Sequence, residues 1–400
     1  MIEEDLVLMG LLAFMFFVSY LLHFPFDRFH IPSLLAPLIV GIILMVIPYT
    51  SNLCVLALSD EYNFLSNLGI MLLIFLIGLR IDVNEFKKQS WNIIVISFLN
   101  IVFSTLIGTI IIVSYGYPLY ISVLISTALA TVAEATVAPI LDELDVIRSR
   151  SANLILGSGI IDDVLEVSLA SLASVIVGGR YLFNPVNIIF GMLTLVFLAS
   201  LLNRFLFPKL ALFEGKISIH SLTMLILLVA ITFTVISEYF NLGILLGAII
   251  AGITFQKFSL KSNSNGRCIE ILRSIAYGFL GPIFFFKIGL SITLDSIIRS
   301  LSLTLLLLFA NFISKFSASI IVGLYSRMNW KEIVVVGWGI SAKFSMGIIP
   351  AQILYSAGFI DEILFTSFIG VSTLTTLIIP FTLSYMVKRW RDSILPDFSP

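Results

Sequence analysis

The chain has 400 residues, of which 59% are hydrophobic and only 12% are charged, and its formal net charge is −1. A soluble globular protein is about a quarter charged, so this chain has too few polar residues to cover a soluble particle. The absence of a basic excess also excludes the electrostatic footprint of a nucleic-acid-binding protein.

Apolar runs long enough to cross a bilayer as helices follow one another along the whole chain. The first begins in MIEEDLVLMG, which lacks the basic segment of a cleaved signal and is predicted to remain as a membrane span. In chain order the sequence predicts thirteen spans, at residues 6–23, 32–48, 63–80, 91–114, 118–138, 154–177, 186–206, 219–238, 241–256, 277–294, 301–324, 332–356 and 362–386.

The Lys and Arg residues between these spans are distributed unevenly. Eighteen lie in loops that follow odd-numbered spans, and two, Arg180 and Arg299, lie in loops on the opposite side. Because basic loops stay in the cytoplasm, this bias predicts an N-terminus outside the cell and a C-terminus in the cytoplasm. Cys54 and Cys268 would then lie on opposite sides of the membrane and could not pair. The sequence contains no nucleotide-binding loop, so we expect no nucleotide partner.

Two pairs of segments resemble each other. LIGLRIDVNEF (76–86) ends the third span and KIGLSITLDSI (287–297) ends the tenth, whereas a weaker pair is LAPLIVGIIL (35–44) and LGILLGAIIAGI (242–253). One copy of the stronger pair would end in the cytoplasm and the other outside. We therefore predict an all-α polytopic membrane protein with two inverted six-helix repeats joined by a linker helix, as is typical of secondary transporters.

Seven ionisable side chains fall inside the predicted spans, where each costs roughly 2.5–3.5 kcal/mol on insertion scales. They are Glu134, Asp162, Asp163, Glu166, Lys287, Lys315 and Lys343. In the sixth span, Asp162 and Asp163 point about 100° apart on a helix, and Glu166 lies on the same broad face. Mutual repulsion and burial raise carboxyl pKa values, so this cluster favours binding of protons or a cation. A purely structural pairing with lysines is the alternative.

The fifth and twelfth spans contain residues that interrupt helices. The fifth, STALATVAEATVAPILDEL (126–144), includes Thr131, Glu134 and Thr136, and the twelfth, GWGISAKFSMGIIPAQI (337–353), includes Lys343. Broken helices expose backbone carbonyls that can hold a cation. We therefore predict two broken helices that cross at the ion site; simple kinks at the prolines are the alternative.

Two further lysines lie within spans. Lys315 is near the centre of the eleventh span, too deep to reach water easily, and needs an acidic partner, of which the sixth span holds the richest supply. Lys287 lies in GPIFFFKIGL of the tenth span. We expect Lys287 to line a cavity or to pair locally, with a role in transport as a further possibility.

These motifs resemble those of the monovalent cation:proton antiporter superfamily, and the resemblance covers nearly the whole chain. The IDDV of the sixth span is similar to the paired-aspartate motif of the two-aspartate, electrogenic sodium/proton antiporters. Other segments that resemble family helices are HIPSLLAPLIVGIIL (30–44), LGIMLLIFLIGLRID (68–82), GFLGPIFFFKIGL (278–290) and SKFSASIIVG (314–323).

The resemblance implies roles for individual residues. Asp163 looks like the aspartate that binds the ion and carries the proton, with Asp162 beside it as a second Na⁺ ligand and as the partner of Lys315. Lys343 stands where many relatives have an arginine. Two features depart from the family pattern: the first helix break lacks the frequent Thr-Asp-Pro motif, and Glu166 has no counterpart.

The resemblance also implies a secondary transporter rather than an enzyme, without a cofactor, that forms a homodimer in the cytoplasmic membrane. The expected domains are a scaffold or dimerisation domain (1–90 and 211–298), a core ion-transport domain (91–178 and 299–390), a linker helix (179–210) and a cytoplasmic tail (391–400). The implied activity is electrogenic exchange of Na⁺ or Li⁺ for H⁺ by an elevator-type movement of the core.

Other functions stay open from the sequence alone. A K⁺/H⁺ antiporter and a Na⁺-coupled organic anion symporter could use the same repeat. An intramembrane aspartyl protease is disfavoured, because its two acids must face each other across a gap, whereas Asp162 and Asp163 are adjacent on one helix. A channel-like sensor would not need Lys315 to compete for the acids.

Overall fold

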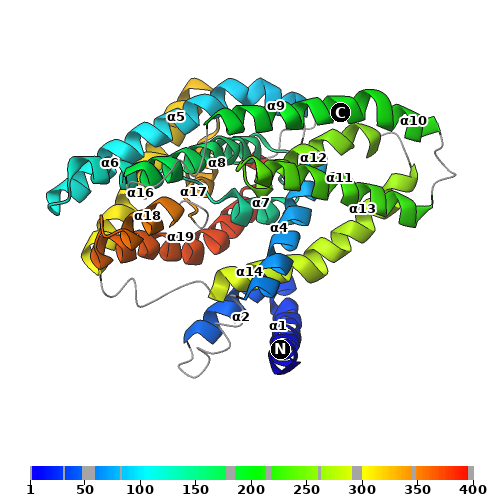
Figure 1. Cartoon of the computed structure of the whole chain (residues 1–400), viewed down its shortest axis with the longest axis horizontal. Helices are drawn as coiled ribbons and strands as arrows, with labels where there is room; N and C mark the ends of the chain where they lie inside the picture. Colours follow the sequence, from blue (N-terminus) through cyan, green and yellow to red (C-terminus); the bar gives the residue numbers. More distant parts are fainter. Residues whose placement is uncertain are drawn as a thin grey trace. The chain divides into compact units, whose positions relative to one another are not determined.

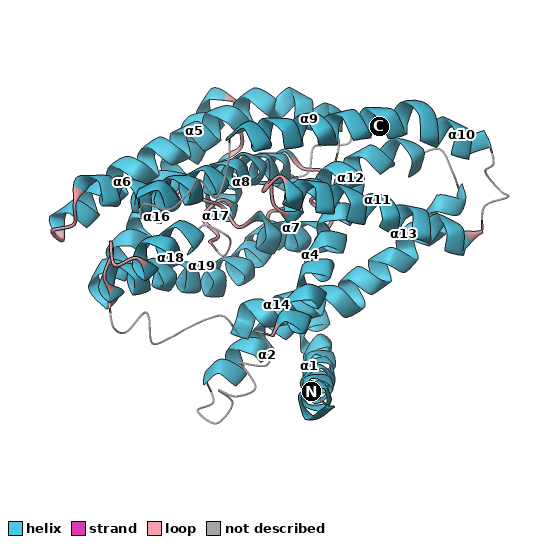
Figure 2. Ribbon diagram, in the orientation of Figure 1, coloured by secondary structure: helices cyan, strands magenta, loops and turns pink. Residues whose placement is uncertain are grey.

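The computed structural model describes residues 2–29, 32–46, 59–81, 83–176, 185–212, 218–259, 263–290, 300–343 and 348–394. Within these ranges all regular structure is helical (Figure 2). The all-α class predicted from the sequence is confirmed for this part of the chain.

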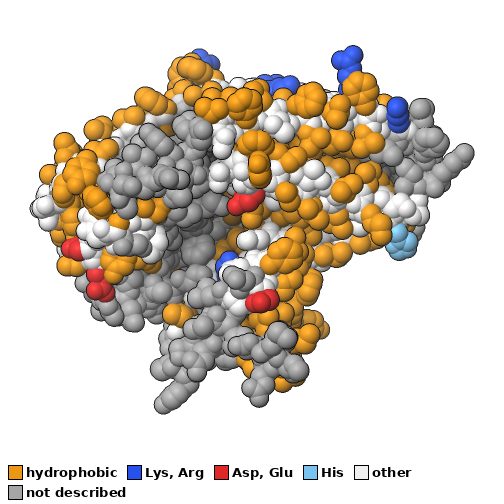
Figure 3. Space-filling model, in the orientation of Figure 1, with side chains coloured by type: hydrophobic (Ala, Val, Ile, Leu, Met, Phe, Trp, Pro, Cys, Tyr) orange, Lys and Arg blue, Asp and Glu red, His pale blue; other side chains and the backbone are white. Residues whose placement is uncertain are grey.

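Many of the helices are apolar enough to cross a membrane. Eight segments in the described ranges qualify by length and composition: Leu6–Phe26, Glu61–Arg80, Phe86–Ser114, Ile189–Lys209, Ile219–Tyr239, Cys268–Leu290, Leu301–Tyr325 and Glu362–Arg389. Hydrophobic side chains also cover much of the described surface in the view of Figure 3, which suits a lipid environment. The chain is therefore a polytopic α-helical membrane protein. The count of thirteen spans and the side of each loop stay predictions.

The chain divides into two compact units. Unit 1 comprises residues Met1–Ile81 and Ile188–Ile292, and unit 2 comprises Asp82–Asn187 and Thr293–Pro400. The helices of unit 1 are α1 (Ile2–Phe29), α2 (Leu35–Val46), α4 (Asp60–Arg80), α9 (Pro185–Leu201, which begins in unit 2), η1 (Leu202–Leu206), α10 (Phe207–Leu212), α11 (Ile219–Tyr239), α12 (Ile244–Ser259), α13 (Asn263–Ile275), η2 (Ala276–Leu280) and α14 (Gly281–Leu290). The α-helices among them are labelled in Figure 1.

Two helix pairs in unit 1 pack backbone against backbone through glycines. A Cβ added at Gly41 of α2 would lie 2.9 Å from the Cα of Gly289 in α14, and a Cβ added at Gly78 of α4 would lie 3.0 Å from the Cα of Gly252 in α12. Only a residue without a side chain fits such a crossing. The IGL repeat noticed in the sequence thus marks two close helix contacts.

The segment between the predicted spans 241–256 and 277–294 is partly helical. Helices α13, η2 and α14 follow one another without a gap from Asn263 to Leu290. Cys268, Leu272 and Ala276 are fully buried at a spacing of four residues, which is the stripe of an amphipathic helix. The polar face of α13 lowers its hydropathy, so a search for apolar runs did not detect this helix.

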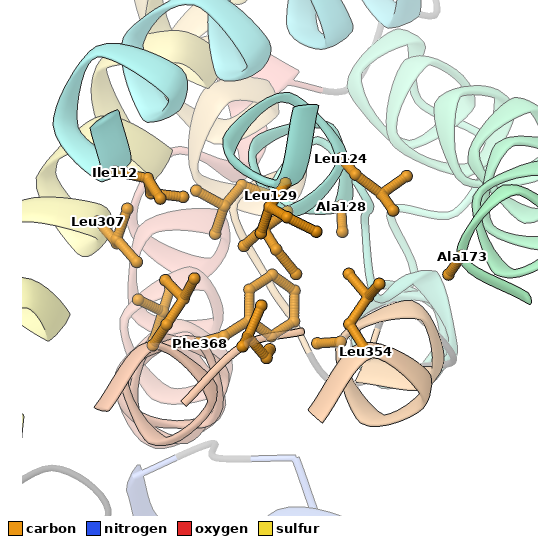
Figure 4. Packing of buried hydrophobic residues seen from close by; sticks show 14 of the residues in the cluster. Ile112, Leu124, Ala128, Leu129, Ala173, Leu307, Leu354 and Phe368 are labelled. Atoms are coloured by element: carbon orange, nitrogen blue, oxygen red, sulfur yellow. The ribbon is translucent and has the colours of Figure 1, made fainter. Parts of the chain in front are cut away.

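The helices of unit 2 are α5 (Val83–Ser114), α6 (Leu119–Ala128), α7 (Glu134–Glu143), α8 (Arg150–Ile176), α16 (Leu301–Tyr325), α17 (Trp330–Gly339), α18 (Ile348–Ser356), α19 (Glu362–Arg389) and α20 (Arg391–Ile394). Residues of α5, α6, α8, α16, α18 and α19 form a hydrophobic cluster. Figure 4 shows Leu124 of α6 and Leu129, the residue that follows α6, packed among side chains such as Leu307, Leu354 and Phe368 of α16, α18 and α19. This packing holds the short helix α6 in place although it has few internal hydrogen bonds.

Candidate ion site

Two helix breaks meet inside unit 2. The fifth predicted span is divided into α6 and α7, which are separated by residues 129–133, and the twelfth into α17 and α18. Residues 344–347 of the second break lie outside the described ranges. The backbone N–H of Ala133 donates to the carbonyl of Ala342 at 2.9 Å, so the two breaks are in direct contact. Each break leaves helix-terminal N–H and C=O groups without helical partners.

An asparagine from a neighbouring long helix binds each break. Asn100 of α5 donates through Nδ2 to the Ala130 carbonyl at 2.6 Å, and Asn311 of α16 donates through Nδ2 to the Ser341 carbonyl at 3.1 Å. Both bonds join residues 30 positions apart. Neither amide was predicted from the sequence, although an asparagine within an apolar span is a signal that could have indicated it.

Lys315 is fully buried and its ammonium group lies at the first break. Nζ donates to the carbonyls of Ala130 at 2.7 Å and Thr131 at 2.9 Å. These carbonyls follow the C-terminal end of α6, where the helix dipole favours a positive charge. Beside it, Ser104 of α5 and Ser314 of α16 are joined by a hydrogen bond of 2.9 Å. The ammonium group therefore binds carbonyls that were predicted from the sequence to hold a transported cation.

Lys343 lies at the same break and shares one carbonyl with Lys315. Its Nζ donates to the carbonyls of Ala128 at 3.3 Å and Thr131 at 3.2 Å, and its backbone N–H donates to the Thr375 hydroxyl at 3.2 Å. The Thr131 carbonyl thus accepts from both Lys343 and Lys315. The first break is neutralised by two ammonium groups, one from α16 and one from the second break.

Buried acids lie near the breaks. Glu134 is the first residue of α7, where the N-terminal end of the helix favours a negative charge, and it is only 6% exposed. Its carboxylate rests against Gly159 of α8, because a Cβ added there would lie 2.6 Å from Oε2. Asp162, 1% exposed, is three residues further along α8 and on the same side of that helix.

The predicted hydroxyl residues of the first break are also buried. The Thr131 hydroxyl donates to the Ala128 carbonyl at 3.0 Å. Thr136 lies in the first turn of α7. Carbonyl, hydroxyl and carboxylate oxygens of this kind are the ligands that broken-helix transporters offer to Na⁺.

Three predicted residues have no described relation to the breaks. Asp163 and Glu166 belong to α8, but their side chains lie outside what the structure describes, so the predicted Na⁺ ligand Asp163 has no geometry here. Lys287 is half-buried on α14 and belongs to unit 1, whereas the breaks belong to unit 2. No group of three or more His, Cys, Asp or Glu side chains with metal-binding spacing occurs among the described residues.

Known proteins are similar to this chain in sequence and in fold. The model of the family described as "Sodium/hydrogen exchanger, transmembrane" matches residues 12–389. A Na(+)/H(+) antiporter of Enterococcus hirae is 23% identical over 366 residues, covering 90% of this chain and 93% of that protein. The Na(+)/H(+)-K(+) antiporter GerN of Bacillus cereus is 25% identical over 371 residues, covering 88% and 89%. A solved structure of the sodium proton antiporter MjNhaP1 from Methanocaldococcus jannaschii has a TM-score of 0.67 at 16% identity, covering 99% of both chains.

Proposed function

Because this chain belongs to the sodium/hydrogen exchanger family, we propose that it exchanges Na⁺ or Li⁺ for protons across the cytoplasmic membrane as a secondary antiporter. Members of that family are transporters rather than enzymes. The observation that carries the proposal is the fully buried ammonium of Lys315 on the open carbonyls of Ala130 and Thr131. A cation that binds there competes directly with a charged group of the protein.

The proposed ion site combines α8 with the two breaks. Asp163 binds the cation from one side of the membrane and a proton from the other, and Asp162 adds a second oxygen ligand and pairs with Lys315. The burial of Asp162 supports this role, because a carboxylate away from water needs a cation, a proton or an ammonium nearby. Binding of the cation weakens the Asp162–Lys315 pair, and release of a proton balances part of the positive charge that the cation brings in.

The proposed architecture is a pair of inverted six-helix repeats, with α9 in the linker. Corresponding positions in the sequence support it, because the same number of residues separates the two members of each pair. The pairs are Asn100 and Asn311, Ala130 and Ser341, Pro139 and Pro350, Gly41 and Gly252, and Gly78 and Gly289. This register shift also relates the first and last residues of α6 to those of α17. Thirteen spans, an external N-terminus and a cytoplasmic C-terminus follow from this arrangement and from the distribution of basic residues.

We assign unit 1 to the scaffold and dimerisation domain and unit 2 to the core ion-transport domain. The core would carry the cation past the scaffold as an elevator, and two scaffolds would form a homodimer. Two titrating groups, Asp163 and the Asp162–Lys315 pair, make the proposed exchange electrogenic. K⁺/H⁺ exchange is the second candidate, favoured by the similarity to the Na(+)/H(+)-K(+) antiporter GerN.

The test is an assay in proteoliposomes that contain the purified protein and a pH-sensitive dye. An outward gradient of Na⁺, Li⁺ or K⁺ is imposed in turn, and the proton flux is recorded with and without a membrane potential. We expect the largest flux with Na⁺ or Li⁺, and a rate that responds to the potential. A flux driven by K⁺ alone would favour the second candidate, and no flux with any of the three would refute antiport.

A further inference from the structure

The side-chain oxygen of Asn311 is an unused acceptor next to Lys315. Asn311 is fully buried, and its Nδ2 is fixed by the bond to the Ser341 carbonyl, but no donor among the described residues reaches its Oδ1. A buried acceptor without a donor costs free energy and is rare in native proteins. Such an oxygen is an acceptor to which a donor can turn in another state of the protein.

The corresponding amide in the other long helix has such a donor. The Oδ1 of Asn100 lies 3.2 Å from the hydroxyl of Ser104, one turn further along α5, and shares that donor with Ser314. The register shift that relates Asn100 to Asn311 relates Ser104 to Lys315. Lys315 thus stands where the donor for Asn311 is expected, but its ammonium group is directed to the carbonyls of the first break.

Lys315 can reach Asn311 without any movement of the backbone. Residues four apart on a helix are neighbours, with about 5–6 Å between their Cβ atoms. Long side chains on a helix also lean toward its N-terminus, over the preceding turn. A change of lysine rotamer is therefore sufficient to move the ammonium group from the carbonyls to the amide oxygen.

We propose that Asn311 is a positioning residue that holds the ammonium group of Lys315 while the transported cation occupies the carbonyls of Ala130 and Thr131. The inference deepens the proposed function and rests on it. Without a second acceptor, a displaced Lys315 would be left buried with fewer hydrogen bonds. The free-energy cost of that state would lower the affinity for the cation. Asn311 thereby lowers the free energy of cation binding, although it does not have to touch the cation.

The test measures cation affinity without transport. The full-length protein in detergent is titrated with NaCl, LiCl or KCl at constant ionic strength, and the rise of its unfolding temperature gives an apparent Kd for each ion. Asn311→Leu removes the acceptor at similar volume, whereas Asn311→Asp keeps an acceptor and loses the donor. Both are made in the wild type and in Lys315→Met. The unfolding temperature without added cation reports any damage to the fold.

We expect Asn311→Leu to raise the apparent Kd about tenfold or more, the value of one hydrogen bond to a charged group. Asn311→Asp should bind the cation at least as tightly as the wild type. In Lys315→Met, where there is no ammonium group to hold, Asn311→Leu should leave the Kd unchanged within about twofold, because the effect passes through the lysine.

Three results would overturn the inference: an unchanged Kd in Asn311→Leu, an equal rise of the Kd in the Lys315→Met background, or an Asn311→Asp protein that behaves like Asn311→Leu. These leave the proposed function intact, provided that the wild type binds a monovalent cation. A wild type that binds none of the three ions would refute the proposed function and this inference with it.

Discussion

Replacing Gly159 by alanine tests whether the position of Glu134 matters for exchange. The added Cβ would lie 2.6 Å from Oε2, 2.7 Å from Cδ and 2.8 Å from Cβ of Glu134, so the whole side chain must shift. Overpacking of this kind costs roughly 1–3 kcal/mol of folding free energy. Alanine recovers about 0.5–1 kcal/mol of that through its better helix propensity. We expect a net loss of stability of ~1–2 kcal/mol.

Gly157 on the same helix provides a matched control. A Cβ added at Gly157 would clash with Cδ1 of Ile93 and lie 2.7 Å from its Cγ1 and 2.8 Å from its Cγ2, which is at least as much crowding but against an apolar side chain. Gly157→Ala and Gly159→Ala should therefore lower the unfolding temperature by similar amounts. Only Gly159→Ala displaces a buried carboxylate beside the helix breaks.

The decisive measurement compares the apparent KM for Na⁺ of the two variants in proteoliposomes. We expect a several-fold change of the KM for Gly159→Ala and a value near that of the wild type for Gly157→Ala. An equal change of the KM in both variants would mean that general strain in α8 is responsible. In that case the reasoning about Glu134 fails.

Three further predictions concern Asp163, Lys315 and Tyr117. Asp163→Asn should insert and fold but lose cation-driven proton flux, because the side chain can no longer alternate between a proton and a cation; near-normal flux would contradict its assignment. Lys315→Gln should lose the response of the exchange rate to an imposed membrane potential, and a response equal to that of the wild type would make the lysine purely structural. Burial and the 2.6 Å hydrogen bond to the Asp361 carboxylate raise the pKa of Tyr117. This stabilisation is complete below the ordinary tyrosine pKa of about 10 and is lost as the pH rises through the folded-state pKa. Tyr117→Phe should therefore unfold at a lower temperature at neutral pH and approach the wild type at alkaline pH; a constant difference across the pH series would contradict this.

The sequence predicted features that depend on local composition. Apolar runs indicated the membrane helices, and the proline and hydroxyl residues around Thr131 indicated a helix break where α6 and α7 are separated. The lone lysine in the middle of an apolar span directed attention to Lys315, because a buried ammonium group must find acceptors.

Features that depend on contacts distant in sequence were not predicted. The carbonyls at the first helix break were predicted to bind a transported cation, whereas in the structure they accept from the ammonium groups of Lys315 and Lys343. No local pattern indicates that Asn311 reaches Ser341, or that Gly159 makes room for Glu134. These relations arise from the packing of α16 and α8 against the breaks, which hydropathy and spacing do not encode.

The glycine crossings of unit 1 limit how that unit can deform. Helices that touch through side chains can slide past each other in small steps as rotamers change. At Gly41 and Gly289, and again at Gly78 and Gly252, main chain meets main chain, and no side chain is available to absorb a shear. Any sliding of α2 along α14, or of α4 along α12, must first separate the two backbones and lose all of their dispersion contacts at once. We therefore expect these four helices to be stiff over the whole working cycle, with amide hydrogens at the crossings among the slowest in the protein to exchange with deuterium.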